Sequence, residues 1–136
     1  MIQNKPIILV DPYPRTMDLL FSKTNLKYLK KNFKLITAPN KNKNNFYEKN
    51  LSKADYIFGQ PNLPTSLISK STKLKAIFNV ESNFMDNMDY DYCFRKGIHV
   101  LATSPVFAQP VAEMAIGLTL SIARSIHIAH SDFISK

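Results

Sequence analysis

Three histidines, one cysteine and three glycines are the residues of this 136-residue chain that could take part in histidine, thiol or phosphate-loop chemistry. A catalytic histidine needs a carboxylate or nucleophile as partner, and the sequence places none beside His99, His127 or His130, so we expect structural roles for them. Cys93 alone forms neither an internal disulfide nor a cysteine-based zinc site. The glycines at 59, 97 and 117 lie too far apart for a G-x-G-x-x-G or Walker-type loop. The sequence therefore predicts no catalytic group, no metal and no dinucleotide cradle in this chain.

Positive charge is concentrated in the first part of the chain. Residues 1–50 contain ten Lys or Arg against three acids, and residues 51–136 contain eight against seven, which gives +8 in total. A basic segment is typical of nucleic-acid binding, but only three of the 18 cations are Arg, the residue that base readers and phosphate clamps favour. We therefore expect no nucleic-acid partner. No uninterrupted apolar run reaches the roughly 18 residues of a membrane span, and the single cysteine favours a cytoplasmic protein.

Short apolar runs rich in β-branched residues alternate with helical patterns over residues 1–101. The best defined helix is 86–96, with Asp86 as its N-cap, Asp89 three residues later and Gly97 as its left-handed stop. Strands that alternate with helices predict an α/β fold, with a five-stranded parallel sheet and helices on both faces. We expect the strands at 6–10, 33–37, 54–58, 74–80 and 98–101.

The segment 111–128 is apolar or small at almost every position, which predicts a long C-terminal helix that begins near Pro110. A local sheet can cover only one side of such a helix. We expect the uncovered sides to drive dimerisation or aggregation. The apolar residues on these different sides are Met114, Leu118 and Ile122, and then Ile116, Leu120 and Ile126.

A family resemblance rests on the residues from 74 to 126. In order and with matching spacing, the chain has L-K-A-I-F-N-V-E-S-N-F-M-D-N-M-D-Y, then R-K-G-I-H-V-L-A-T-S-P, then P-V-A-E-M-A-I-G-L-T-L-S-I-A-R-S-I. This region resembles the D-isomer-specific 2-hydroxyacid dehydrogenases, which include phosphoglycerate, glycerate and hydroxypyruvate reductases. The resemblance implies a flavodoxin-like substrate-binding domain at 1–103, and a hinge and interdomain helix at 104–136. It also implies that the nucleotide-binding Rossmann domain, with the glycine-rich loop and the catalytic Arg, Glu and His, lies beyond this chain.

The same resemblance implies that the loop Glu81-Ser82-Asn83-Phe84 binds the carboxylate of a small 2-hydroxy or 2-oxo acid through backbone amides. Unpaired amides between a strand end and a helix start suit an anion. Asn83 matches a position that contacts both substrate and cofactor, while Ser82 and Phe84 stand where the family commonly has glycines. Glu81 adds a negative charge, so its side chain either points away or meets a hydroxyl or cation. Without the resemblance, this loop is an ordinary strand-to-helix turn formed by Asn and Ser.

Two further residues are candidates for lining the substrate cleft. Gln60 follows the third predicted strand at the same edge of the sheet, and Phe107 stands where many family members have an asparagine. The resemblance thus predicts the substrate-binding portion of an NAD- or NADP-dependent oxidoreductase that acts on a small D-2-hydroxy acid. We expect this portion to be inactive alone and to form a homodimer through its C-terminal helix. The alternative is a standalone flavodoxin-like module that binds a small anion or a partner protein without catalysis.

Overall fold

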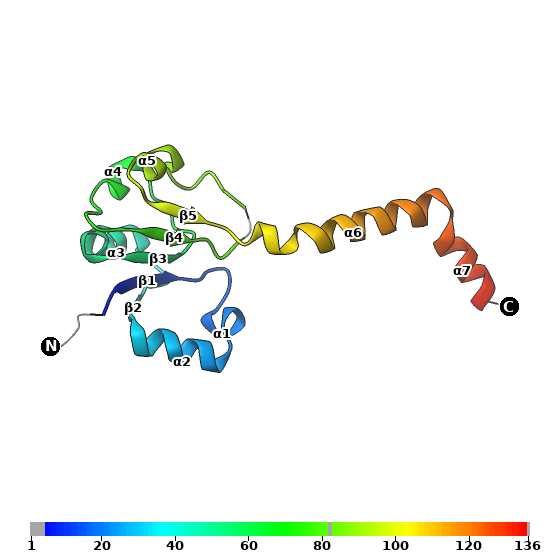
Figure 1. The fold of residues 1–136 in the computed structure, drawn as a ribbon, viewed down its shortest axis with the longest axis horizontal. Helices are drawn as coiled ribbons and strands as arrows, with labels where there is room; N and C mark the ends of the chain where they lie inside the picture. Colours follow the sequence, from blue (N-terminus) through cyan, green and yellow to red (C-terminus); the bar gives the residue numbers. More distant parts are fainter. Residues whose placement is uncertain (1–4, 82, 136) are drawn as a thin grey trace. The chain divides into compact units, whose positions relative to one another are not determined.

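The computed structural model describes residues 5–81 and 83–135, which form two compact units, Met1–Thr103 and Ser104–Lys136. The first unit contains a sheet of five parallel strands in the order β2-β1-β3-β4-β5, which confirms the predicted α/β fold (Figure 1). β4 is shorter than the predicted 74–80, because residues 79 and 80 run past the ladder. The strands are β1 (Ile7–Asp11), β2 (Lys34–Thr37), β3 (Tyr56–Gly59), β4 (Ala76–Phe78) and β5 (His99–Leu101).

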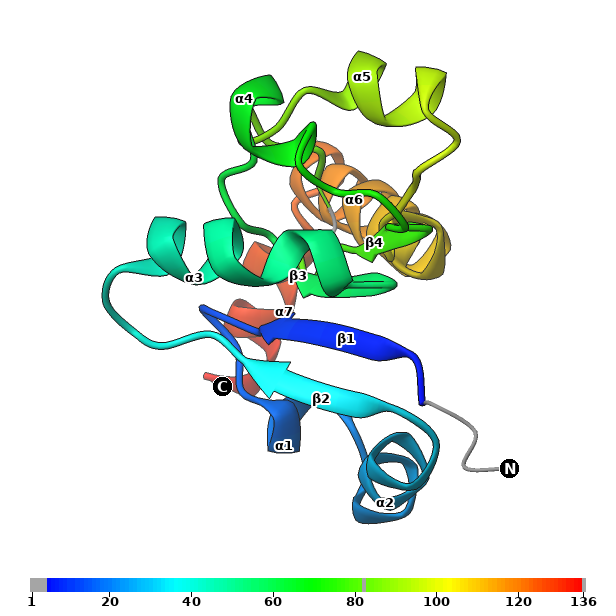
Figure 2. The same ribbon diagram turned by 90° about the vertical axis from the view of Figure 1, so that its left-hand side faces the viewer.

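Helices cover both faces of this sheet, as the alternating pattern predicts. Leu9, Ile57 and Ile77 project from one face into a buried core, where they are packed with residues of three helical segments. The other face, which carries Val10 and Phe58, meets two helices that lie on the opposite side (Figure 2). The helices on the face of Leu9 are α3 (Lys43–Asn50), α4 (Thr65–Ile68) and α5 (Tyr90–Arg95), with a 3-10 turn at Leu51–Lys53. The helices on the face of Val10 are α1 (Met17–Leu20) and α2 (Lys23–Asn32).

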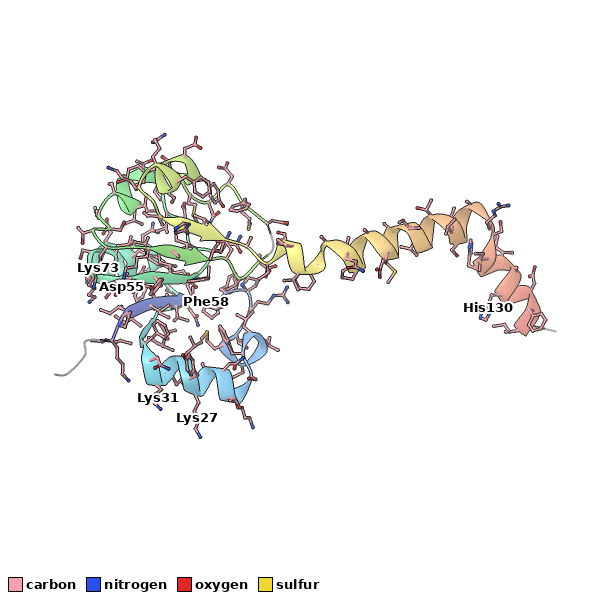
Figure 3. The ribbon with its side chains drawn as sticks, in the orientation of Figure 1. Lys27, Lys31, Asp55, Phe58, Lys73 and His130 are labelled. Atoms are coloured by element: carbon pink, nitrogen blue, oxygen red, sulfur yellow. The ribbon has the colours of Figure 1, made fainter. Side chains whose placement is uncertain are left out.

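Packing is looser on the face that α1 and α2 cover. An apolar cavity of about 420 Å³ lies between these helices and the sheet. Phe58, labelled in Figure 3, is on this face, and its ring centroid lies 5.1 Å from that of Phe21. Lys27 and Lys31, one turn apart on α2, are exposed and point away from the sheet (Figure 3). Part of the N-terminal positive charge therefore lies on a solvated helix face.

Asp55 connects two strands at the amino edge of the sheet, where the parallel strands begin. Its Oδ2 accepts a hydrogen bond from the Ile7 backbone amide at 2.9 Å and lies 3.4 Å from the Lys73 ammonium (Figure 3). Asp55 precedes β3 and Ile7 begins β1, so this carboxylate holds together the starts of two neighbouring strands.

The helix predicted at 86–96 begins later than expected. α5 starts at Tyr90, and its N-cap is Asp89, whose Oδ1 accepts from the Tyr92 amide at 2.8 Å. Asp86 is therefore not the cap, because residues 86 and 87 form a turn and Met88 is held in a bridge before the helix begins. The Leu63 amide donates to the Asn87 carbonyl at 2.7 Å, and Leu63 forms a parallel bridge with Met88. Gly97 adopts φ +71° directly after the helix, as predicted.

We expect the stabilising effect of Asp89 to depend on pH. Hydrogen bonds from Thr65 and from the Tyr92 amide lower the pKa of its carboxyl. A lowered folded-state pKa gives stability that is present at neutral pH and is lost as the pH falls through that pKa. D89A should therefore unfold at lower urea than the wild type at neutral pH, and this difference should shrink as the pH falls below 3.8, the ordinary pKa of an aspartate. Urea unfolding followed by circular dichroism measures both, with D91A as the control on the same helix. A pH-independent difference would contradict the assignment.

The second unit consists of two helices, α6 (Ser104–Ala123) and α7 (Ile126–Ile134). The prediction of one helix from Pro110 to Ile128 is wrong at both ends. Pro105 occupies the first turn and Pro110 lies inside α6, so the proline expected to open the helix is an interior one. Ser125, in the left-handed region at φ 53°, separates the two helices. His127 and His130 consequently lie on α7, and Figure 3 labels His130 there.

α6 is apolar and exposed along its whole length. It has no buried residue, and an 18-residue window within it has a mean hydropathy of 1.5. By length and composition it is the one helix among residues 5–81 and 83–135 that could cross a membrane, a test that core helices of soluble proteins also pass. The sequence analysis expected no membrane span, because it considered only uninterrupted apolar runs.

Candidate functional site

The segments that leave the strands meet at one edge of the sheet, here called the carboxyl edge. All five strands are parallel, so the residues after β1, β3 and β4 emerge on the same side. At this edge lie Asp11, the last residue of β1, and Arg15, then Gly59, the last residue of β3, and Gln60, and then the loop 81–84, here called the anion loop. Ligands of open parallel sheets bind outside this edge.

Gln60 clamps the anion loop from the neighbouring strand. Its Oε1 accepts from the Glu81 amide at 2.9 Å, and its Nε2 donates to the Asn83 carbonyl at 2.8 Å. The sequence places Gln60 at this edge, and the structure brings it into contact with the predicted loop. Its polar atoms are used to hold the loop backbone.

Removing this clamp should loosen the anion loop. We expect Q60A to lower the free energy of unfolding by about 1 kcal/mol, because two partly exposed hydrogen bonds are lost. The amide hydrogen of Glu81 should exchange with solvent markedly faster, since Gln60 is its acceptor. Hydrogen exchange followed by nuclear magnetic resonance (NMR) measures this. The Ile57 amide, inside β3, serves as the internal control, and unchanged exchange at Glu81 would show that Gln60 does not hold the loop.

The anion loop presents backbone donors at its exposed end. Within the described part of the chain, the amides of Asn83 and Phe84 donate no hydrogen bond. Both residues are exposed, and the Phe84 ring packs edge-on against Tyr90 with 5.2 Å between centroids. Ser82, the fourth predicted loop residue, lies outside the described residues. Two adjacent unpaired amides at this position are donors that a carboxylate can accept from.

Glu81 is paired with a cation that the sequence analysis did not identify. The Arg15 Nε lies 3.0 Å from Glu81 Oε1, and the two residues are 66 positions apart. The pair neutralises the negative charge that the sequence placed beside a predicted anion site. The position of Arg15, four residues after the end of β1, was the signal that could have indicated it.

Two side chains of α3 contact the buried Asp11 carboxylate at the end of β1. The Lys43 ammonium lies 2.7 Å from Asp11 Oδ1, and the Tyr47 hydroxyl donates to Asp11 Oδ2 at 3.3 Å. Burial, followed by the negative charge of Asp11, raises the pKa of Tyr47, so its hydroxyl stays protonated. These contacts join α3 to β1 and were not predicted from the sequence.

Asn79 lies at the same edge, directly after β4, but its side chain forms no hydrogen bond to the described residues. Its side chain is 3% exposed, and neither its Nδ2 nor its Oδ1 has a hydrogen-bond partner in the described part of the chain. An unpaired buried polar group costs about 1–3 kcal/mol. Its backbone amide donates to the Leu101 carbonyl at 2.8 Å, which extends the β4–β5 pairing by one bond.

The remaining predicted residues lie elsewhere. Phe107 is exposed on α6, in the second unit. His99 is exposed on β5, and His127 Nδ1 lies 3.3 Å from the Ser121 carbonyl oxygen. Cys93 is buried in the core, where burial raises the pKa of its thiol.

Solved structures of known proteins resemble this chain in sequence and in fold. No family model and no curated protein matches the chain. Among solved structures, a phosphoglycerate oxidoreductase from Rhizobium etli is 37% identical over 97% of this chain, with a TM-score of 0.76. Over nearly all of its length the chain is similar to proteins of the D-isomer-specific 2-hydroxyacid dehydrogenase family. The resemblance identified over residues 74–126 is thereby confirmed.

Two more distant members share the fold. A glyoxylate/hydroxypyruvate reductase from Sinorhizobium meliloti, solved with NADP and malonate, is 23% identical with a TM-score of 0.58. A 3-phosphoglycerate dehydrogenase from Entamoeba histolytica, solved with NAD⁺, is 21% identical with a TM-score of 0.56. Each matches 86% of this chain. The chain spans 41%, 34% and 39% of the Rhizobium, Sinorhizobium and Entamoeba dehydrogenases, respectively.

Proposed function

We propose that this chain is the substrate-binding portion of an NAD(P)-dependent oxidoreductase acting on the CH–OH group of a small D-2-hydroxy acid. The observation that carries the proposal is the pair of unpaired amides at Asn83 and Phe84, at the carboxyl edge of a dehydrogenase-family sheet. The substrate carboxylate accepts hydrogen bonds from these amides. Gln60 keeps the loop in position, and Arg15 offsets the charge of Glu81.

The residues present do not form a dinucleotide site. The three glycines of the sequence lie far apart. Gly59 is the last residue of β3 and Gly97 follows α5, so neither belongs to a glycine-rich phosphate-binding loop. A nicotinamide cofactor supplies hydride chemistry to this family, and Asn83 is the one residue that we assign toward it. No residue of this chain is assigned a catalytic step, and we expect the chain by itself to turn over no hydroxy acid.

Binding of glycolate, the simplest 2-hydroxy acid, tests the proposal. In an NMR titration of the ¹⁵N-labelled chain, glycolate should shift the amide signals of Asn83 and Phe84 and leave the signals of α2 unchanged. Glycolamide, its uncharged counterpart, should have little effect because the loop binds an anion. Shifts that are absent at the loop, or equal for both compounds, would overturn the proposal.

The cofactor assignment has a separate test. We expect NADH to bind this chain at millimolar affinity at best, because a helix N-terminal pyrophosphate cradle supplies most of the orientation in dinucleotide sites. Calorimetry measures this affinity, and tight stoichiometric binding would contradict the expectation.

We also propose that the chain forms a homodimer through α6 and functions in the cytoplasm. The dimer is supported by the exposed apolar residues along α6, and the reducing location by the single, buried Cys93. Phe107, on the same helix, remains a candidate for the substrate cleft.

A further inference from the structure

We propose that the apolar cavity between α1, α2 and the sheet binds a hydrophobic monocarboxylic acid, which has an extended apolar chain and one anionic head. The chain occupies the cavity, and the Lys30 ammonium at its mouth receives the head. This ligand class differs from the short hydroxy acids proposed for the anion loop. The cavity lies under α1 and α2, whereas the loop follows β4, so this site is a second one.

The size and lining of the apolar cavity favour a bound ligand. Protein interiors are close-packed, and voids larger than a water molecule are few. Small-molecule pockets occupy roughly 300–1,000 Å³, and the volume of this cavity, about 420 Å³, falls within that range. All ten side chains that line it are aliphatic, aromatic or thioether. Apolar cavities stay dry and bind apolar molecules, so these walls select an apolar chain.

Aromatic rings form much of the cavity wall, and they come from both the helical layer and the sheet. The ring centroids of Phe21 and Phe58 lie 5.1 Å apart. That of Tyr56 lies 6.1 Å from Phe33 and 6.2 Å from Phe78. None of these five residues is buried, although all of them line the cavity. Their accessible apolar surface is the surface that an acyl chain covers.

A second space of about 480 Å³ adjoins the apolar cavity on the side of the edge strand β2. The two spaces share four lining residues, which are Val10, Met17, Phe33 and Leu35. The second space also carries polar side chains, which are those of Asp18, Lys30 and Thr37. A ligand that occupies both spaces therefore meets apolar walls at one end and polar groups at the other.

Lys30 is the cation that suits an anionic head. It lies four residues after Leu26 and three before Phe33, and all three line the second space, so Lys30 shares the sheet-facing side of α2 with them. It has no ion-pair partner among the residues that the structure describes, and Asp18 at the same mouth is not paired with it. Lys27, by contrast, points away from the sheet (Figure 3). The unpaired ammonium beside an apolar cavity makes the site favour an acid.

A series of unbranched acids tests the cavity on the full chain. Butyrate, hexanoate and octanoate differ by two methylenes at each step. Since each buried methylene tightens binding about fourfold, we expect roughly 15-fold tighter binding per step. In NMR titrations of the ¹⁵N-labelled chain, the acids should shift the amide signals of Leu35 and Phe58. The amide of Cys93, in the core on the other face, is the internal control, and glycolate should leave the cavity signals unchanged.

The decisive comparison is between K30M and K27M, which remove the same charge from the same helix. K30M should bind octanoate about fivefold more weakly than K27M, the effect of one partly exposed charge pair. Both should bind 1-octanol, the uncharged counterpart, equally well. L29W fills the cavity from α2, because Leu29 lines it, and should weaken octanoate roughly tenfold or more. Unchanged core amide signals show that each variant is folded.

Three results would overturn the site. The first is an affinity that does not rise with chain length, and the second is an equal effect of K30M and K27M on octanoate. The third is unchanged octanoate binding in L29W, because the acid would then lie elsewhere, such as on the exposed apolar surface of α6. None of these results affects the anion loop, which glycolate tests separately through the amides of Asn83 and Phe84.

Discussion

Replacing Leu118 with lysine is expected to convert a self-associating chain into a monomer. Phe107, Val111, Met114, Leu118 and Ile122 are spaced four, three, four and four residues apart, so they form one continuous stripe along α6. All five are more than half exposed. A stripe with this spacing is the seam by which two helices pack against each other.

The expected effect is large because a symmetric dimer contains the substitution twice. Burying one leucine contributes about 1.5–3 kcal/mol, and a lysine at the seam also opposes its copy. We therefore expect L118K to weaken the dimer by roughly 100-fold or more. Sedimentation velocity at micromolar concentration measures the association.

I116K is the matched control, since Ile116 is equally apolar but lies on the opposite side of α6. We expect it to improve solubility with a smaller effect on dimerisation. A larger effect of I116K than of L118K would move the interface to the other side of the helix, and a wild-type monomer with α6 ordered would refute the proposed dimer.

Replacing Gly59 with alanine is expected to destabilise the first unit severely. A Cβ at this position would lie 2.2 Å from the Asp11 carbonyl oxygen, and the backbone adopts φ +148°, where side chains are rarely found. The neighbouring atom is backbone of β1, so relief requires two paired strands to separate. We expect a loss of at least about 3 kcal/mol from the free energy of unfolding, a large part of what a domain of this size has.

Gly97 provides the comparison, because it also has a positive φ, +71°, but no atom within 4 Å of a Cβ. G97A should cost only about 1–2 kcal/mol, the strain of a left-handed conformation alone. Urea unfolding monitored by circular dichroism gives both values. If G59A and G97A were equally destabilising, the close approach of β3 to β1 would not be the cause.

The order of strands and helices in the first unit could be predicted from the sequence. Apolar β-branched runs such as Ile7–Val10, and stops such as Gly97, are local signals, and a parallel sheet follows from their alternation. The position of the anion loop between β4 and α5 follows from the same order, and the ligand that we propose for it comes from the family resemblance.

Local patterns did not decide between equivalent signals. Asp86 and Asp89 both fit an N-cap, and the pairing of Leu63 with Met88 selects Asp89, because the helix begins only after this bridge. Pro105 and Pro110 both fit a helix start, and the helix begins at the earlier of the two. The left-handed residue that ends α6 is a serine, which sequence patterns do not mark as a stop.

The amino-acid sequence by itself indicated the family resemblance, the succession of parallel strands and helices, and the loop that we propose binds an anion. Only the tertiary structure showed that Gln60 clamps this loop, that Arg15 pairs with Glu81, and that Asp11 is buried with Lys43 and Tyr47. These contacts join residues 21 to 66 positions apart. A parallel sheet gathers the ends of distant strands at one edge, and the side chains that meet there depend on strand order and register, which local propensity does not encode.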